Sequence, residues 1–516
     1  MARLRPTAKR LHVVTALGFA AIAVGLWTRS VAAHTFVEST KPEAGSTVRD
    51  TPRSVLIRFT EPAELTFGGI EVFDPDRNRV DAAETEYASD DRREVRVGLE
   101  PELSDGTYIV EWRVLALDGH PRSGRFRFKL DQPVDPTPPP TPEATPVSPS
   151  AGMGAGPPAS EEHAPQGAGA LPPVLLGITR WILFASLLLL VGVGAFAHAS
   201  WRPAAFEARP AEVEGEFQRR LRPVVGWAWV GAVVASVSSV AFQGAVAADV
   251  PLGEAVSGEI LGGVLTTRFG LVTAVRVGLL ALLGAALLGA RAAQGRRMLV
   301  PAVARRSLGA AAAAPEARRS MVGWALVGVA LLATISLTGH AGTSSPIVLG
   351  MGADVAHLAA GATWVGGLIG LLALAFPATR RRSDGERVSL LAPVVTRFSN
   401  LAVWSVALLV ATGTIRGWME IRTLAGLTGE AYGITLLVKL AVVVPLLILG
   451  AVNNRWTKPR IRRAAQEATE TESGTSALQT LNRLVLLEVV LAAVVLAVTA
   501  VLAAQSPPAG EMGGTH

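Results

Sequence analysis

The chain has 516 residues, 50% of them hydrophobic, and a mean hydropathy of +0.37, which excludes both an ordinary soluble protein and a disordered one. The net charge of +6 does not indicate nucleic-acid binding, because the arginines gather in short connections between apolar segments, as in membrane proteins. The chain has no cysteine, so disulfides and thiolate metal ligands are excluded.

The first 33 residues have the pattern of a secretory leader. A basic stretch (1–12) precedes an apolar stretch (13–27), and the small residues Val31-Ala32-Ala33 follow as a cleavage site. The alternative is an uncleaved transmembrane helix, for which the apolar stretch is short. Cleavage after Ala33 makes His34 the first residue of the mature protein.

A metal site is predicted at this new N-terminus. The α-amine and imidazole of His34 can chelate one metal ion, and Asp118-Gly119-His120 supplies a carboxylate and a second imidazole. Nitrogen and oxygen ligands of this kind suit Cu(II). Glu38 is a further candidate ligand. The alternative is a simple turn with an exposed histidine, since Asp-Gly is foremost a turn signal.

Residues 34–131 are predicted to form an all-β sandwich with Greek-key topology, of the cupredoxin or immunoglobulin type. Apolar and polar residues alternate over short segments, and turn signals such as Asp74-Pro75 separate them. The expected strands lie at 54–59, 69–73, 94–97, 108–114 and 125–130. A tether rich in proline, alanine and glycine follows at 132–170, where His163 is expected to be solvated.

Residues 171–505 are predicted to form an all-α membrane domain of about eight transmembrane helices, followed by an external tail at 506–516. The Arg-rich connections alternate with connections that have few basic residues, so the positive-inside rule places the β-domain and the tail outside. The predicted segments are 174–199, 224–246, 269–290, 321–340, 350–376, 398–418, 433–452 and 484–504.

Polar residues near the outer ends of two of these segments suggest a second site. Asp354 and His357, together with Gly361 and Trp364, fall on one helix face, and an intramembrane carboxylate with an imidazole is costly unless it serves a function. His340 and Met351 lie near the same end and can join a copper pathway. The alternative is an inert pair at the level of the lipid headgroups.

Three further polar residues have open roles. His198 is interpreted as an interfacial histidine, although it can also mark an exit. Lys439 and Glu488 lie near opposite edges of the membrane and are not expected to pair. Glu488 can act as a proton or cation relay, and Lys439 can extend towards the outer surface.

The β-domain resembles the CopC family of periplasmic copper-binding proteins. The resemblance rests on Ala33-His34-Thr35, on Ser39 to Ser46, on Val55 to Pro62, on Gly106 to Val114 and on Asp118 to Gly124. It implies that His34, Asp118 and His120 bind Cu(II). Some members also have a Met-rich Cu(I) site, but no methionine lies between Met1 and Met153, so we expect only Cu(II) here.

The membrane half resembles the CopD family, which accompanies CopC and is linked to copper import or resistance. Each motif by itself is unspecific, and the resemblance rests on the order and spacing in which the motifs occur. The motifs are Asp354 to His357, Trp364 to Leu368, Arg397-Phe398-Ser399, Thr412-Gly413, Tyr432-Gly433, Leu437-Val438-Lys439, Gly450 to Asn453 and Pro507-Pro508.

Together these features predict a bacterial inner-membrane copper protein rather than an enzyme. An external sandwich captures Cu(II), and the helices pass copper inward through His340, Asp354 and His357, with Cu(I) as a candidate form in the membrane domain. The expected partners are copper, the lipid bilayer and external copper chaperones or cuproenzymes, with no nucleic acid. The alternatives are a membrane oxidoreductase resembling a b-type cytochrome, and a copper chaperone or sensor that transports nothing.

Overall fold

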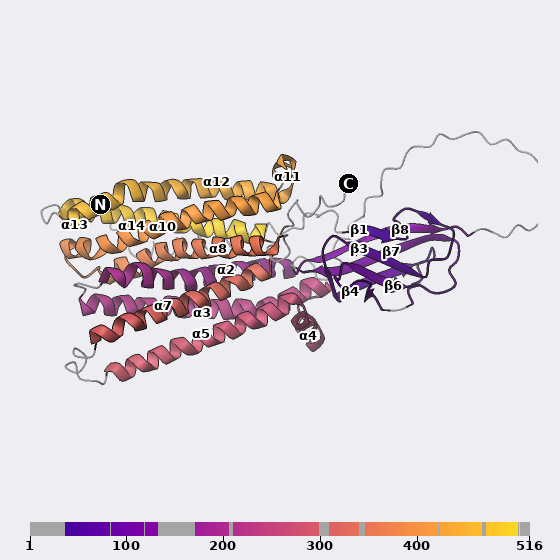
Figure 1. Ribbon diagram of the computed structural model, residues 1–516, viewed down its shortest axis with the longest axis horizontal. Helices are drawn as coiled ribbons and strands as arrows, with labels where there is room; N and C mark the ends of the chain where they lie inside the picture. Colours follow the sequence, from indigo (N-terminus) through magenta and orange to yellow (C-terminus); the bar gives the residue numbers. More distant parts are fainter. Residues whose placement is uncertain are drawn as a thin grey trace, which may run out of the picture. The chain divides into compact units, whose positions relative to one another are not determined.

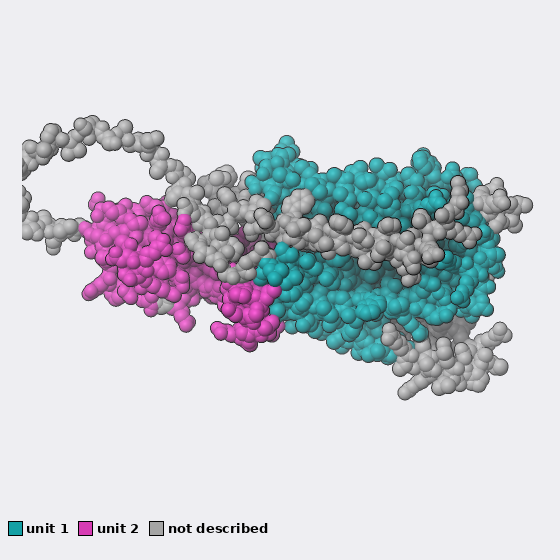
Figure 2. Space-filling view, turned by 180° about the vertical axis from the view of Figure 1, so that it is seen from behind, with its two compact units in different colours: residues 1–31, 170–243, 268–509 teal, residues 32–169, 244–267, 510–516 magenta. Residues whose placement is uncertain are grey.

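The computed structural model describes residues 37–82, 84–117, 119–132, 171–205, 210–298, 309–339, 346–421, 423–466, 471–503 and 505. The predicted leader, tether and tail lie outside the described residues, apart from Gln132 at the start of the tether. The chain divides into two compact units, which are coloured separately in Figure 2. One unit contains the long helices and the other contains the strands (Figure 1).

The described strands form two four-stranded sheets. Their orders are β1-β3-β6-β5 and β2-β8-β7-β4. All pairings are antiparallel except that between β2 and β8, which the alternation of residues did not reveal because β2 has only two residues. The strands are β1 Val37–Lys41, β2 Thr47–Val48, β3 Ser54–Phe59, β4 Ala63–Phe73, β5 Glu86–Tyr87, β6 Glu94–Gly98, β7 Gly106–Ala116 and β8 Pro121–Leu130.

The alternation of residue types creates a shared core between the two sheets. In β3, Val55, Ile57 and Phe59 are fully buried, and the residues between them are not. Side chains from both sheets join one hydrophobic cluster, in which Phe59 packs edge-to-face on Trp112 at 5.3 Å. The predicted β-sandwich is therefore confirmed. Every buried member of its core comes from residues 55–130, so this core is complete within the β-domain.

The second unit is built from long apolar helices joined by short helical turns. Its helices are α2 Leu171–Phe196, α3 Ala211–Ala248, α5 Arg268–Met298, α7 Gly309–Leu337, α8 Ile347–Ile369, α9 Phe376–Ala378, α10 Asp384–Glu420, α11 Leu424–Thr428, α12 Ala431–Val452, α13 Lys458–Gln466 and α14 Thr471–Leu502. The short helix α4 (Gly258–Thr266) and the last residues of α3 group with the strands in the other unit. Between them lie a 3₁₀ turn, η2 (Pro203–Ala205), and three π-helical turns, η1 (Ala197–Trp201), η4 (Gly370–Ala375) and η5 (Asn453–Thr457).

Seven helices of the described chain are long and apolar enough to cross a membrane. The eighth predicted segment lies in α7, whose apolar part, Met321–Leu337, is shorter than the other spans. Many apolar side chains on these helices are exposed, among them Leu282, Val234 and Ile448. Exposed apolar surface on this scale suits contact with lipid and not with water. The prediction of a membrane domain is confirmed.

Helices α2 and α8 pack with their backbones in contact. A Cβ atom added to Gly192 would lie 1.8 Å from the carbonyl oxygen of Ala362, and one added to Gly366 would lie 2.4 Å from the backbone of Gly192. Only glycine fits at either position. Small residues allow this close approach because membrane helices associate through packing and not through expulsion of water.

Candidate metal sites

The hairpin between β7 and β8 carries the first candidate ligand, His120. The strands stay paired up to Leu115 and Pro121, and the backbone of Ala116 donates to the carbonyl of His120 at 2.9 Å. Gly119 has a φ of +84°, which favours glycine at this turn. The turn therefore fixes the backbone position of His120, which is half-buried.

The other two predicted ligands, His34 and Asp118, lie outside the described residues, but the strand register locates their neighbours. Val37 pairs with Phe59 at the end of β3, and Ala63 at the start of β4 pairs with Ala116. Because Phe59 and Ala63 are four residues apart, the start of β1 and the β7–β8 hairpin lie at the same end of the sandwich. His34 precedes Val37 by three residues, a reach of about 10 Å.

Two carboxylates near this end differ in their surroundings. Glu38 accepts from Arg58 at 2.9 Å, and Arg58 also pairs with Glu94 at 2.5 Å. These bonds, first that with Glu94, raise the pKa of the Arg58 guanidinium above its usual value. Glu38 is thus already engaged by a cation. Glu64, which was not predicted, is buried and lies opposite Leu115 in the register. The described residues contain no group of three or more His, Asp or Glu side chains arranged to hold a metal.

In the helical unit, the predicted polar face of α8 lies against α10. Asp354 forms an ion pair with Arg416 at 3.1 Å, and Nδ1 of His357 lies 3.0 Å from Oγ1 of Thr412. Further along the same face, Gly361 lies next to Leu409. Asp354 and His357 are therefore neighbours on one helix, and each has its own partner on the opposite helix.

The ion pair belongs to a larger polar network that the sequence had not indicated. Arg416 also pairs with Glu420, which accepts a hydrogen bond from the hydroxyl of Tyr432. Lys439 interacts electrostatically with both carboxylates and with Arg416. The charges of the two acidic side chains in this network therefore balance those of the two basic side chains. Arg416 and Glu420 are four residues apart on one helix, and this spacing in the sequence could have indicated their ion pair.

The hydrogen bonds around His357 indicate its tautomer. The hydroxyl of Thr412 donates to the carbonyl of Leu408 at 2.6 Å, so its oxygen can only accept from the imidazole. We infer that the proton lies on Nδ1. A neutral imidazole with its proton there has a lone pair on Nε2, the form in which histidine binds metals.

The remaining predicted residues have varied surroundings. His340 lies outside the described residues, and Met351 is half-buried on α8, three residues before Asp354. His198 contacts the carbonyl of Gly194 in its own helix at 2.9 Å and stacks on Trp324. These contacts favour a structural role for His198. Glu488 accepts from Asn453.

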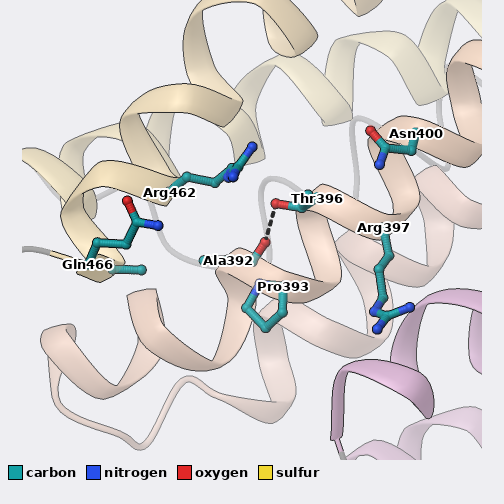
Figure 3. Close-up of a pocket in the computed structure, with 8 residues that line it drawn as sticks. Ala392, Pro393, Thr396, Arg397, Asn400, Arg462 and Gln466 are labelled. Atoms are coloured by element: carbon teal, nitrogen blue, oxygen red, sulfur yellow. Dashed lines mark hydrogen bonds between the residues drawn. The ribbon is translucent and has the colours of Figure 1, made fainter.

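A surface pocket between α10 and α13 contains none of these residues. Its lining includes Arg397, Asn400 and Arg462. Figure 3 shows that the two arginine side chains extend in different directions, and that Thr396 bonds to the backbone of Ala392. No histidine or methionine lines this pocket, so it does not suit copper.

Three family models match the chain. The CopC domain matches residues 37–131, the N-terminal domain of copper resistance protein D-like proteins matches 171–308, and copper resistance protein D matches 392–502. These matches confirm both resemblances and define the class as a copper-related membrane protein. The chain joins a CopC domain to a CopD-type membrane region in one polypeptide.

The chain is also similar to individual proteins. The copper transport protein CutJ of Bacillus subtilis (strain 168) is 26% identical over 445 residues, which cover 85% of this chain and 71% of CutJ. Copper resistance protein C of Escherichia coli is 31% identical over 108 residues, covering 20% of this chain and 84% of that protein. The crystal structure of CopC from Methylosinus trichosporium OB3b is 30% identical, covers 20% of this chain and 100% of that chain, and has a TM-score of 0.19.

Proposed function

We propose that this protein captures Cu(II) outside the cytoplasmic membrane and passes copper inward through its helices. The capture site comprises His34 with its free amine, Asp118 and His120. The observation that carries this proposal is the strand register, which brings the start of β1 and the β7–β8 hairpin to one end of the sandwich. CutJ, which is similar over most of this chain, is named as a copper transport protein.

The proposed membrane route begins at the polar end of α8. Nε2 of His357 supplies a ligand, and His340 and Met351 are the other candidates on this side. A thioether and imidazoles suit Cu(I), so Cu(II) captured outside must gain one electron from an external reductant before it enters this route. Asp354 supports the route by holding α8 to α10 through Arg416, and its charge is balanced there. The function is binding and transfer, with no chemical conversion of a substrate.

Copper flux into lipid vesicles tests the proposal. Vesicles containing the purified full-length protein are expected to accumulate copper faster than vesicles without protein, measured as internal metal after external copper is removed. Equal accumulation in the two preparations would exclude transport and would favour a chaperone or sensor that only binds copper.

The proposed orientation gives a separate prediction. Single cysteines at Ser344 and Ser383 can be labelled without background, because the chain has no cysteine. Ser383 caps the N-terminus of α10 beside three arginines, Arg380 to Arg382, and is expected on the cytoplasmic side. An impermeant thiol reagent added to spheroplasts should label residue 344 and leave residue 383 unlabelled. The opposite pattern would reverse the assigned orientation.

A further inference from the structure

A second buried polar pair lies apart from the network around Arg416. Glu488 on α14 is 2% exposed, and Asn453, which follows α12, is 8% exposed. The side-chain amide of Asn453 donates to Oε1 of Glu488. The other amide atom, Oδ1 of Asn453, is buried and has no hydrogen-bond partner in the part of the chain that the structure describes. This pair therefore has an acceptor that still needs a donor.

No described side chain supplies a compensating charge to Glu488 through an ion pair. Among the residues that the structure describes, the side chain of Glu488 hydrogen-bonds to Asn453 and forms no ion pair. Charged or titratable side chains do occur on the elements that pack against α14, but none of those described forms an ion pair with Glu488. They include Arg180 on α2, Asp354 and His357 on α8, Asp384, Glu386, Arg387, Arg397, Arg416 and Glu420 on α10, Lys439 on α12, Arg455 in η5, and Lys458, Arg460, Arg462 and Arg463 on α13, with Arg483 on α14 itself.

An ionised carboxylate is costly in such a place. Removing it from water without a cation nearby is unfavourable, and buried acids of this kind avoid the cost by taking up a proton. A protonated carboxyl group is also a donor, and Oδ1 of Asn453 is the acceptor that lacks one. Protonation thus removes the charge and satisfies the second group of the pair.

The pair lies far from the first polar network along α12. Tyr432 stands near the start of this helix and Asn453 directly after its end. At a rise of 1.5 Å per residue, the 21 steps from Tyr432 to Asn453 span about 31 Å, roughly the thickness of the hydrocarbon core. Asn453 also opens the π-helical turn η5, and such turns often occur at functional sites.

We propose that Glu488 and Asn453 form a proton-binding site whose occupancy changes as copper passes through the membrane domain. The inference rests on the proposed transport function and identifies the proton as the ion whose movement is coupled to that of copper. The carboxylate takes up one proton to become a neutral carboxyl group, and releasing that proton restores the charge.

The chemistry of the pair favours a proton over a metal ion. Ca²⁺ and Mg²⁺ need about six or more oxygen ligands, whereas this site offers one carboxyl group and one amide. Cu(I) prefers sulfur and imidazole ligands, which neither side chain supplies. A proton needs only the carboxyl group and an acceptor.

Infrared spectroscopy of the purified full-length protein tests proton binding without any copper flux. Difference spectra between acidic and alkaline buffer should contain the carbonyl stretch of a buried protonated carboxyl group. The band should be lost in Glu488→Gln, which keeps the shape and the acceptor for Asn453. It should remain in Glu212→Gln, which changes a carboxylate paired with Arg382. Asn453→Leu should shift its titration midpoint. Identical spectra for the parent protein and Glu488→Gln would overturn the proposal.

Copper flux then tests coupling. In vesicles, the parent rate is expected to change with pH by up to about tenfold per pH unit, the limit for a single proton. Glu488→Gln should remove this dependence while the external domain still binds Cu(II). If both proteins transport copper with the same pH dependence, the coupling role is wrong. If the parent protein transports no copper, both the proposed transport function and this coupling are wrong. The infrared band then still shows whether Glu488 binds a proton.

Discussion

A domain of residues 34–131 with one extra residue before His34 is expected to bind Cu(II) about 100-fold more weakly than the domain that begins at His34. This loss corresponds to about 2.7 kcal/mol. The extra residue converts the α-amine into an amide and so removes one arm of the chelate. Because the buried core of the sandwich lies entirely within residues 55–130, the domain should fold by itself. Competition titration with a Cu(II) chelator and the EPR spectrum measure the effect.

Two substitutions serve as matched comparisons for this domain. His120→Ala should also weaken binding, by about 10- to 100-fold, because it removes a ligand while the hairpin backbone remains. Glu38→Gln should leave affinity unchanged, since this carboxylate already pairs with Arg58. Thermal unfolding of every variant shows that the fold is retained. An extended domain with the same affinity and the same EPR spectrum as the parent would contradict the proposed ligand set.

The variant His357→Ala is expected to capture copper normally and to transport almost none. Its external site is untouched, so Cu(II) affinity should match that of the parent protein. Copper accumulation by cells expressing the variant should fall to the level of cells without the protein, because the imidazole at the polar end of α8 is lost. Metal analysis of washed cells measures this. Accumulation equal to that of the parent would remove His357 from the route and would favour the chaperone or sensor function.

Substitutions around His357 separate loss of a ligand from loss of packing. Thr412→Val keeps the shape of the side chain but removes the oxygen that accepts from Nδ1, so transport should decrease. Thr412→Ser keeps that oxygen, so this variant should transport copper at the rate of the parent protein. His198→Ala is the control for removing an intramembrane histidine, because its contacts are with Gly194 and Trp324. A defect in His198→Ala as large as that in His357→Ala would indicate a general packing effect.

The main features of the fold could be predicted because each has a strong local signal. Alternation in segments such as Ser54–Phe59 arises from burial of one strand face, and the long apolar segments arise from the thickness of the bilayer. The parallel pairing of β2 with β8 was not predictable in this way. It joins two residues to a strand about eighty positions away, and a short strand has too little pattern to reveal its partner.

The surroundings of the candidate sites were harder to predict than their residues. Asp354 and His357 could be placed on one face of α8 from their spacing, but their partners Arg416 and Thr412 lie on another helix. Pairing between helices depends on their relative rotation, which periodicity does not determine. The link between Asn453 and Glu488 was missed for the same reason, because these residues are separated by 35 positions in the chain.

The contact between Gly192 and Gly366 has a consequence for any motion that accompanies transport. Two helices whose backbones touch cannot slide past each other without a clash of main-chain atoms, because neither side has a flexible side chain that can yield. Helices α2 and α8 should therefore move as a single rigid body that carries His357. Spin labels on α2 and α8 would keep a constant separation throughout the cycle.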